Sequence, residues 1–251
     1  MKRLSGKCVV VTGGTSGLGE DAVLRFLQEG AQVVFTGRDK DKAAKVIKKA
    51  LKISSKIHFF KQNVTDEADW QALVQALPSL MPRVDILVNN AGAFIVGPIE
   101  GLSEEDFSWL YELNVGSIFL GIKYLMPIMK QQGGGVILNN ASLSGMVGHE
   151  HCIAYCTSKA AAIQLGLVAA LEGAPYKVRV VSVAPGPVWN DMLATKFGDT
   201  DEMRDFFVDT QPYKTLCVPK HVTDAMVFLV SDEARYITGT TVKVDCGRGA
   251  D

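Results

Sequence analysis

The sequence predicts an α/β fold in which a doubly wound parallel sheet carries helices on both faces. Three observations lead to this prediction. Short apolar segments alternate with amphipathic ones along the whole chain, the apolar segments are continuous, and a glycine-rich turn follows the first of them. Continuous apolar strands are typical of parallel sheets buried on both faces. No linker, charge block or internal repeat divides the sequence, so we predict a single domain over residues 1–251.

Each predicted element rests on a local pattern. Helix 18–29 stops at Gly30, helix 66–77 is expected to end at Pro78, and the long helix 103–130 begins at Ser103, a residue suited to cap it. The remaining predicted helices are 39–52, 153–172 and 220–230. The predicted strands are the apolar runs 8–11, 32–35, 57–60, 86–88, 136–138, 178–184 and 242–244.

The stretch 186–218 breaks this regular alternation. It contains Pro187, Pro212, several acidic residues and the aromatic pair Phe206-Phe207. We therefore expect an irregular segment here. Long irregular segments inside a compact domain are commonly functional, which favours a substrate lid over about 187–212.

Composition narrows the function classes. The chain has 47% hydrophobic and 21% charged residues and a formal net charge of −1. It therefore lacks the excess of positive charge that is typical of proteins that bind nucleic acid or anionic membranes. No apolar stretch is expected to reach the roughly 20 residues of a membrane helix, and the first seven residues lead directly into a strand, without a secretory signal. The five scattered cysteines indicate no disulfide framework, so we expect a cytoplasmic protein.

The turn after the first strand, Thr12 to Gly19, opens a helix. Its glycines, Gly13, Gly17 and Gly19, allow a sharp turn and a close approach of the backbone to a phosphate. The free N–H groups and positive dipole end of the helix favour an anion there. This spacing differs from the usual G-x-G-x-x-G pattern, and a glycine-rich turn can also be purely structural.

A second pattern is Tyr155 and Lys159, which share one face of the predicted helix because they are four residues apart. A nearby ammonium group favours the phenolate form, so we expect Lys159 to lower the pKa of Tyr155 toward the working range of an acid–base catalyst. This spacing alone also occurs by chance in helices.

Two further segments support a cofactor site. Asn89-Asn90-Ala91-Gly92 follows the fourth strand, and Ala184-Pro185-Gly186 ends the sixth, both at the carboxyl edge where such sheets bind ligands. With the glycine turn and Tyr155–Lys159, they occur in an order that resembles the short-chain dehydrogenase/reductase family. The resemblance runs from Thr12 to Val244-Asp245-Cys246-Gly247 and implies a Rossmann fold.

The resemblance implies a nicotinamide cofactor and a set of residues that contact it. Asn63 stands where the family usually has an Asp that receives the adenine amino group, and Asn190 stands where a Thr often holds the carboxamide; both keep hydrogen-bonding capacity. The implied cofactor-binding residues are Gly13, Thr15, Ser16, Gly17, Leu18, Gly19, Arg38, Asn63, Val64, Asn90, Ala91, Gly92, Tyr155, Lys159, Pro185, Gly186, Val188 and Asn190.

The residues at the end of the second predicted strand indicate whether the cofactor is NADP(H) or NAD(H). Gly37 replaces the acid that would bind a ribose 2′-OH and repel a 2′-phosphate, and Arg38 can bind a phosphate bidentately. Against this, Ser16 stands where many NADP-dependent members have a basic residue, Asp39 follows Arg38, and Arg38 could simply be solvated. We favour NADP(H), with NAD(H) as the alternative.

The catalytic residues implied by the resemblance are Asn114, Ser142, Tyr155 and Lys159. Tyr155 would exchange a proton with the carbonyl or alcohol oxygen, and Ser142 would hydrogen-bond the same oxygen. Lys159 would lower the Tyr155 pKa and bind the nicotinamide ribose, and Asn114 would support a proton path from Lys159 to solvent. Singly, a serine at a strand end or an asparagine in a helix is ordinary. Together they favour catalysis.

Four residues near Tyr155 could suggest a metal: His149, His151, Cys152 and Cys156. Their spacing does not match structural zinc sites, so we predict no metal and interpret them as lining a substrate pocket. Cys156 could make the protein sensitive to thiol reagents. The aromatic residues Phe107, Trp109 and Tyr111 suggest core or interface positions, and the resemblance implies a homodimer or homotetramer.

These features predict an oxidoreductase that interconverts a carbonyl and a secondary alcohol with a nicotinamide cofactor. The alternative from another class is a cofactor-sensing binding protein that does no chemistry. A hydrophobic or aromatic small-molecule substrate is favoured because the expected pocket segments carry mostly apolar side chains. These side chains are Phe94, Met146, Trp189, Met192, Phe206 and Phe207.

Overall fold

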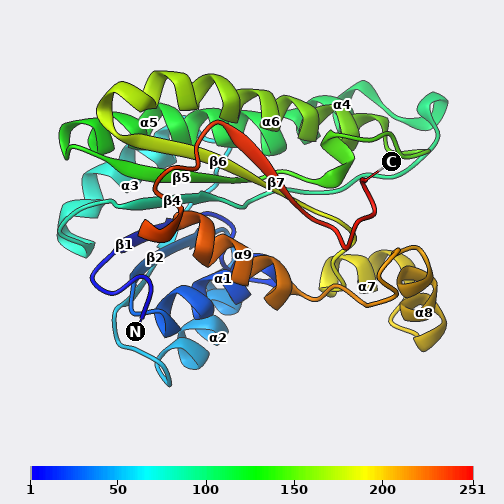
Figure 1. Ribbon diagram of the computed structural model, residues 1–251, viewed down its shortest axis with the longest axis horizontal. Coiled ribbons are helices and arrows are strands. Elements are labelled where there is room, and N and C mark those ends of the chain that lie inside the picture. Colours follow the sequence, from blue (N-terminus) through cyan, green and yellow to red (C-terminus); the bar gives the residue numbers. More distant parts are fainter. Residues whose placement is uncertain (1, 251) are drawn as a thin grey trace.

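A parallel sheet forms the centre of the computed structural model, which describes residues 2–250 (Figure 1). Its strand order is β3-β2-β1-β4-β5-β6-β7, and every neighbouring pair is parallel. The strands are β1 (Cys8–Val11), β2 (Gln32–Gly37), β3 (Ile57–Lys61), β4 (Ile86–Asn89), β5 (Gly135–Asn140), β6 (Val178–Pro185) and β7 (Thr240–Val244). The predicted doubly wound α/β fold is confirmed, and each strand overlaps its predicted range.

Helices cover both faces of this sheet (Figure 1). One face carries α1 (Gly17–Gln28), α2 (Lys40–Ala50) and α9 (Pro219–Val230), and the other carries α3 (Glu67–Leu80), α4 (Glu104–Tyr111), α5 (Ser117–Gln131) and α6 (Ile153–Gly173). Each side has its own hydrophobic core, with Phe26 and Met226 fully buried in the first and Trp70 and Leu125 fully buried in the second. Burial on both faces explains why the strands are continuously apolar.

Capping side chains fix where several helices begin. Asp39 accepts hydrogen bonds from the N–H groups of Asp41 and Lys42, each at 2.9 Å, at the start of α2. Ser103 accepts one from Asp106 at 3.0 Å, as predicted. The predicted end at Pro78 is wrong, because α3 continues to Leu80. Proline removes one N–H and strains one turn, and here the helix tolerates that cost near its end.

The predicted helix 103–130 is one continuous helical run, but it is not uniform. Between α4 and α5, residues Glu112–Gly116 form a turn of π-helix that contains Asn114. Such π turns arise where an extra residue is accommodated in an α-helix, and they are frequent at functional sites.

The stretch 186–218 is more regular than predicted. It contains two short helices, α7 (Asp191–Phe197), capped by Asn190, and α8 (Asp201–Asp209), capped by Thr200. Figure 1 shows α7 and α8 together at one end of the molecule. The expectation of irregular structure was wrong because these helices are too short to show a clear periodic pattern, so the capping residues were their main sequence signal.

Helix α6 is apolar enough to resemble a membrane span, contrary to expectation. The segment Ile153–Tyr176 has a mean hydropathy of 1.3. It contacts β6, α5 and the short helix Leu143–Gly145, and it carries the buried Lys159. These contacts are those of a core helix packed on a sheet, which accounts for its composition.

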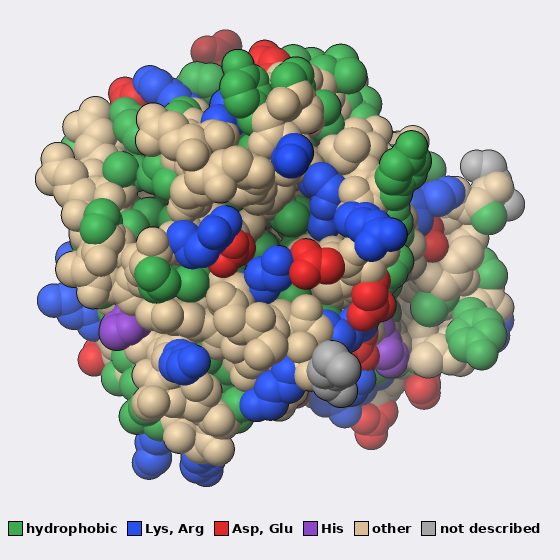
Figure 2. All heavy atoms as spheres, turned by 60° about the vertical axis from the view of Figure 1, so that its left-hand side comes forward, with side chains coloured by type: hydrophobic (Ala, Val, Ile, Leu, Met, Phe, Trp, Pro, Cys, Tyr) green, Lys and Arg blue, Asp and Glu red, His purple; other side chains and the backbone are tan. Residues whose placement is uncertain are grey.

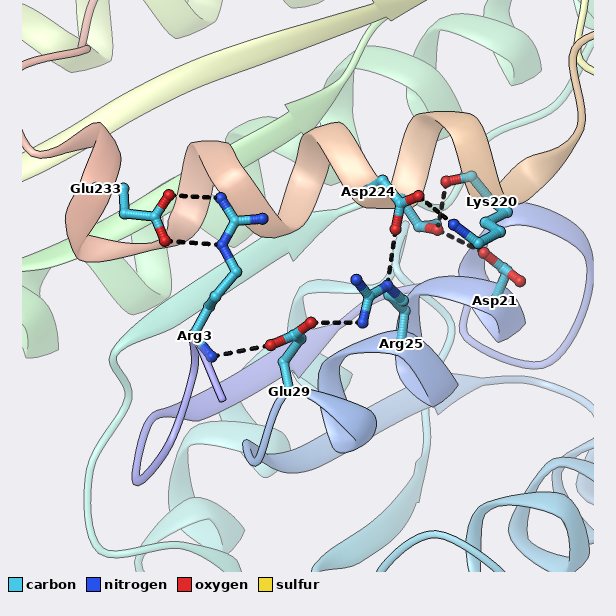
Figure 3. Close-up of polar contacts among 8 residues, drawn as sticks. Arg3, Asp21, Arg25, Glu29, Lys220, Asp224 and Glu233 are labelled. Carbon is cyan, nitrogen blue, oxygen red and sulfur yellow. Dashed lines mark hydrogen bonds and ion pairs between the residues drawn. The ribbon is translucent and has the colours of Figure 1, made fainter. Parts of the chain in front are cut away.

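Charged residues join the N-terminal segment, α1 and α9 in one network (Figure 3). Arg25 donates to Glu29 at 2.6 Å and to Asp224 at 2.8 Å, and the backbone N–H of Arg3 donates to Glu29 at 2.9 Å. Elsewhere on the surface, Lys and Arg side chains are interspersed with acidic ones (Figure 2). The network thus joins the N-terminal segment and α1 to α9 on the sheet face that these helices cover.

We predict that Arg25→Met lowers the free energy of unfolding by about 1 to 3 kcal/mol, a cost between those of breaking exposed and buried ion pairs. The pKa of Glu29 is lowered by a hydrogen bond from the Arg3 backbone and by the Arg25 cation. Burial would raise the pKa of Asp224, but hydrogen bonds from Lys220 and Arg25 lower it overall. Stability from a lowered carboxyl pKa is present above the unfolded-state pKa and is lost as the pH falls through the folded-state value. The difference in the free energy of unfolding between Arg25→Met and wild type should therefore be largest at pH 7 and decrease below about pH 4.

Denaturant titration at several pH values measures this effect. The matched control is Lys49→Met, which removes the more exposed pair with Glu20 and should cost less than about 1 kcal/mol. Equal costs for both variants, or a cost for Arg25→Met that does not change with pH, would contradict the prediction.

Candidate active site

The strand order reverses between β1 and β4, and a cavity of about 700 Å³ opens at the carboxyl ends of the strands. This is the position where doubly wound sheets bind ligands. Every residue predicted for catalysis or cofactor binding lines this cavity except Asn114, which is fully buried behind it. The structure therefore brings residues from 13 to 190 of the sequence to one place.

The glycine turn forms a tight cradle at one end of the cavity. Gly13 and Gly17 have φ angles of 64° and 54°, in the left-handed region that favours glycine. A Cβ on Gly19 would lie 2.1 Å from the carbonyl oxygen of Gly13, so no larger residue fits there. Ser16 caps α1 without a side-chain hydrogen bond to the first turn. The N–H groups of that turn are thus available to an anion.

Asn90 braces this cradle against the sheet. Its Nδ2 donates to the carbonyl oxygens of Thr12 at 3.1 Å and Gly13 at 3.2 Å, and its Oδ1 accepts a hydrogen bond from Asn140 at 3.1 Å. The turn is therefore fixed relative to the end of β5. A pyrophosphate fits the cradle because a rigid set of N–H donors faces a space that glycine leaves open.

The end of β2 shapes the adenosine end of the cavity. A Cβ on Gly37 would lie 2.6 Å from Cγ2 of Thr15, so an acidic side chain could not be added there without displacing Thr15. Arg38 is exposed and has no side-chain partner among residues 2–250. The carboxylate of Asp39 is engaged as the cap of α2, and the hydrogen bonds from Lys42 and Asp41 lower its pKa.

The side chain of Asn63 is already engaged. Its Oδ1 accepts hydrogen bonds from the backbone N–H and the hydroxyl of Thr65, at 3.4 and 3.1 Å. Beside it, Gln62 is 1% exposed and lines the cavity, and neither polar atom of its side chain has a partner within the described part of the chain. The sequence reasoning missed Gln62, although a polar residue directly after an apolar strand was a usable signal.

Three reactive side chains meet at the opposite end of the cavity. Ser142 lies just beyond β5 and accepts a hydrogen bond from the N–H of Ser144 at 3.1 Å. Tyr155 and Lys159 lie on α6, and Nζ of Lys159 is 5.8 Å from the centre of the Tyr155 ring. Nζ donates to the carbonyl oxygen of Asn140 at 2.8 Å. The predicted i, i+4 pair therefore faces the cavity together with Ser142.

Asn114 supports this group from the π turn. Its Oδ1 accepts from the N–H of Ala93 at 2.9 Å, and its Nδ2 donates to the Ala93 carbonyl at 3.0 Å and to Oγ of Ser158 at 3.1 Å. The side chain thus pins the loop after β4 to α6. A Cβ on Gly92 would lie 3.0 Å from Asn114 Oδ1 and 3.5 Å from Lys159 Nζ, which places Gly92 between them.

The pKa of Tyr155 differs from the expectation. Burial raises the pKa of the phenol above its ordinary value, and hydrogen bonding with Ser142 only partly opposes this. Burial also lowers the pKa of Lys159 to about 8. The expected lowering by Lys159 was wrong: the ammonium donates to the Asn140 carbonyl, and burial is the largest influence on the pKa of the phenol.

The rest of this end is mainly apolar, and it includes residues that the sequence did not single out. Phe94 packs edge-on against Tyr155, with ring centres 4.8 Å apart, and Phe207 packs against Trp189 at 5.7 Å. Of the six predicted pocket side chains, three line the cavity: Phe94, Met192 and Phe207. The other three, Met146, Trp189 and Phe206, do not line it. The additional lining residues include Leu113, Leu143, Phe197 and Arg248, and Trp109, predicted at a core or interface position, lines the cavity as well.

The histidines and cysteines near Tyr155 separate into two groups. His149 and Cys152 line the main cavity, as predicted. His151 and Cys156 instead line a second cavity of about 450 Å³, which His149 also borders. Within residues 2–250, no group of three or more His, Cys, Asp or Glu side chains is arranged to hold a metal.

Comparisons with known proteins agree with this geometry. A family model described as "Enoyl-(Acyl carrier protein) reductase" matches residues 13–248. The chain is 32% identical to a cyclopentanol dehydrogenase of Comamonas sp., with all of both chains covered. It is 33% identical to a glucose 1-dehydrogenase of Gluconobacter oxydans, covering 98% of this chain and 92% of that protein.

Solved structures show the same relationship. A structure described as a short-chain dehydrogenase/reductase from Burkholderia xenovorans superposes with a TM-score of 0.95 at 35% identity, covering 100% and 99% of the two chains. A 7α-hydroxysteroid dehydrogenase in complex with NADH and 7-oxo glycochenodeoxycholic acid has a TM-score of 0.92 at 32% identity, covering 98% and 95%. With the family model and these relatives spanning nearly the whole chain, the protein belongs to the short-chain dehydrogenase/reductase family of oxidoreductases.

Proposed function

We propose that this oxidoreductase transfers a hydride between NADP(H) and a carbonyl or secondary-alcohol substrate. The observation that carries the proposal is the shared cavity: Ser142, Tyr155 and Lys159 border the same space as the glycine cradle. A dinucleotide held by the cradle would extend along the sheet edge toward these three residues. When bound, the cofactor supplies the hydride; the protein supplies position, a proton and charge stabilisation.

Each reactive residue has a role that fits its surroundings. Tyr155 would donate a proton to the carbonyl oxygen during reduction and accept one during oxidation. A raised pKa keeps the phenol protonated near neutral pH, which is the form that reduction needs. Ser142 would hydrogen-bond the same oxygen as charge develops on it. The buried ammonium of Lys159 would bind the ribose hydroxyls and return a proton to Tyr155.

Asn114 would act by positioning. Its three hydrogen bonds hold the Ala93 backbone and Ser158, the residue before Lys159, in fixed places. We propose that it keeps Lys159 aligned with a proton path to solvent. A cofactor-sensing protein without catalytic activity would not need Asn114, Ser142, Tyr155 and Lys159 to be grouped at one site. Their grouping favours an enzyme over this alternative.

We propose NADP(H) as the preferred cofactor because of the charges at the end of β2. Arg38 is uncommitted among the described residues, whereas the nearest carboxylate, Asp39, is held as a helix cap. The crowding of Gly37 against Thr15 argues against an acid that would select NAD(H). One observation favours NAD(H): the related 7α-hydroxysteroid dehydrogenase was solved with NADH.

The substrate end supports an apolar carbonyl compound, and α7 and α8 would form its lid. Phe94, Phe197 and Phe207 line that end of the cavity.

We also propose that the protein is a cytoplasmic homodimer or homotetramer. Its support is the exposed apolar side chains on α4, α5 and α6 that do not line the cavity: Phe107, Phe119, Val168 and Leu171.

We predict that Tyr155→Phe lowers kcat for reduction of a ketone by at least about a hundredfold, because the variant keeps the ring but loses the proton donor. The dissociation constant for NADPH, measured by fluorescence titration, should change by less than about threefold, since a single lost hydroxyl contact is a small share of dinucleotide binding. Tyr236→Phe, which alters a fully exposed tyrosine, is the matched control and should behave as wild type. Undiminished kcat in Tyr155→Phe would refute the proposed role.

Cofactor choice has its own test in Arg38→Gln. Loss of a charged contact to the 2′-phosphate should raise KM for NADPH by about ten- to a hundredfold and leave KM for NADH nearly unchanged. Lys52→Gln removes an exposed cation after α2 and serves as the control. A wild-type preference for NADH would assign NAD(H) instead, and an equal effect of Arg38→Gln on both cofactors would refute the proposed contact of Arg38 with the 2′-phosphate.

A further inference from the structure

The segment after β7 brings an arginine into the candidate active site. Arg248 is half-buried and lines the same cavity as Ser142, Tyr155 and Lys159. No pattern in the sequence marked it, and none of the roles proposed above uses it. Its position raises the question of which part of a substrate it would meet.

The backbone that carries Arg248 is tightly held. Asp245 is buried, and its carboxylate accepts hydrogen bonds from the N–H groups of Gly247 at 3.1 Å and Gly249 at 2.9 Å. The N–H of Arg248 itself donates to the Asp245 carbonyl at 3.1 Å. Lys243 also donates to the carbonyl of Gly249. Arg248 is therefore presented from a fixed turn.

This turn lies against the reactive residues. A Cβ on Gly249 would lie 2.3 Å from Cδ1 of Leu143, the residue that directly follows Ser142. A Cβ on Gly186, one of the predicted cofactor-binding residues, would lie 3.1 Å from Cα of Asp245. The turn thus closes the substrate end of the cavity, on the side of Ser142.

The guanidinium group of Arg248 has unused donors. Nη1 donates to the carbonyl oxygen of Thr210 at 3.0 Å, at the end of α8. Among residues 2–250 it forms no ion pair, whereas Arg3, Arg25 and Arg204 each bind a carboxylate. Arginine has five N–H donors in a planar fork, so four remain for a ligand.

Arg248 brings a positive charge to this end of the cavity. Within the described residues, the acidic side chain that lines the cavity is that of Asp191, at the start of α7. Near Arg248, burial and the arginine's charge lower the pKa of His149, which is thereby kept neutral. The carboxylate in the same turn, Asp245, is engaged by the N–H groups of Gly247 and Gly249, and no carboxylate within the described residues pairs with Arg248.

We infer that the substrate carries a carboxylate, bound by Arg248, on an otherwise apolar body that bears the reacting carbonyl or hydroxyl group. The inference rests on the proposed hydride-transfer function and specifies its substrate class. A planar carboxylate matches the arginine fork, and the neighbouring aromatic side chains suit the apolar body. In the competing interpretation, Arg248 only fastens α8 to the last turn through Thr210.

The test compares matched substrates that differ only in charge. Aromatic and alicyclic oxo acids, such as 4-acetylbenzoate and 4-oxocyclohexanecarboxylate, are each paired with the corresponding carboxamide. Reduction is followed with NADPH and NADH for the wild-type protein, Arg248→Gln, Arg248→Lys and the control Arg235→Gln. Arg235 is an exposed arginine that does not line the cavity. Neutral ketones such as cyclohexanone report the basic hydride-transfer activity.

For wild type and Arg235→Gln, we expect kcat/KM to favour the acid over its amide by about ten- to a hundredfold, the size of a charged hydrogen-bonded contact. Arg248→Gln should bring this ratio close to one through a higher KM for the acids, with the amides and cyclohexanone little changed. Arg248→Lys should restore part of the ratio, because it keeps the charge but loses the bidentate geometry.

Two results would overturn the inference, and they are distinguishable. If wild type reduces the neutral ketones but shows no preference for the acids, or if Arg248→Gln slows acids and amides equally, Arg248 is only a structural fastening and the hydride-transfer function stands. If neither neutral nor acidic carbonyl compounds are reduced with either cofactor, the proposed function itself fails, and the inference with it.

Discussion

The ammonium group of Lys159 is the constraint around which this site is built. Lys159 is 4% exposed, and within the described structure its Nζ has one hydrogen bond, to the carbonyl oxygen at the end of β5. Burying a charge is costly unless it is hydrogen-bonded. The cost shows in the pKa of Lys159, which burial lowers to about 8. A lysine held in this way can exchange its proton near neutral pH.

Satisfying that ammonium group requires α6 to lie very close to the end of the sheet. A Cβ on Gly145 would lie 2.6 Å from the backbone carbon of Lys159, and a Cβ on Gly166 would lie 2.9 Å from Oγ of Ser182 on β6. Glycine at these two positions lets the helix approach. The same approach brings Tyr155 beside Ser142, and it lets Asn114 reach Ser158. The geometry of the reactive group thus follows from the packing of one helix.

Much of the fold and of the reactive group was predictable because the signals are local. Continuous apolar runs marked the strands, Ser103 marked a helix start, and the spacing of Tyr155 and Lys159 placed them on one helix face. The π turn around Asn114 was not predictable. It depends on contacts with Ala93 and Ser158, which are 21 and 44 residues away in the sequence. Arg248 was missed for the same reason, since its position depends on Thr210 and Leu143. The raised pKa of Tyr155 depends on burial, which spacing does not show.

The central claim is that Tyr155 and Lys159 serve the exchange of a hydride between a nicotinamide and a carbonyl carbon. Isotope transfer tests it most directly. A ketone such as cyclohexanone is incubated with the protein and NADPH carrying deuterium at both C4 positions, and the alcohol is analysed by mass spectrometry. The account predicts one deuterium on the carbinol carbon of the alcohol. An alcohol without the label, or no alcohol from any carbonyl compound with either cofactor, would contradict it.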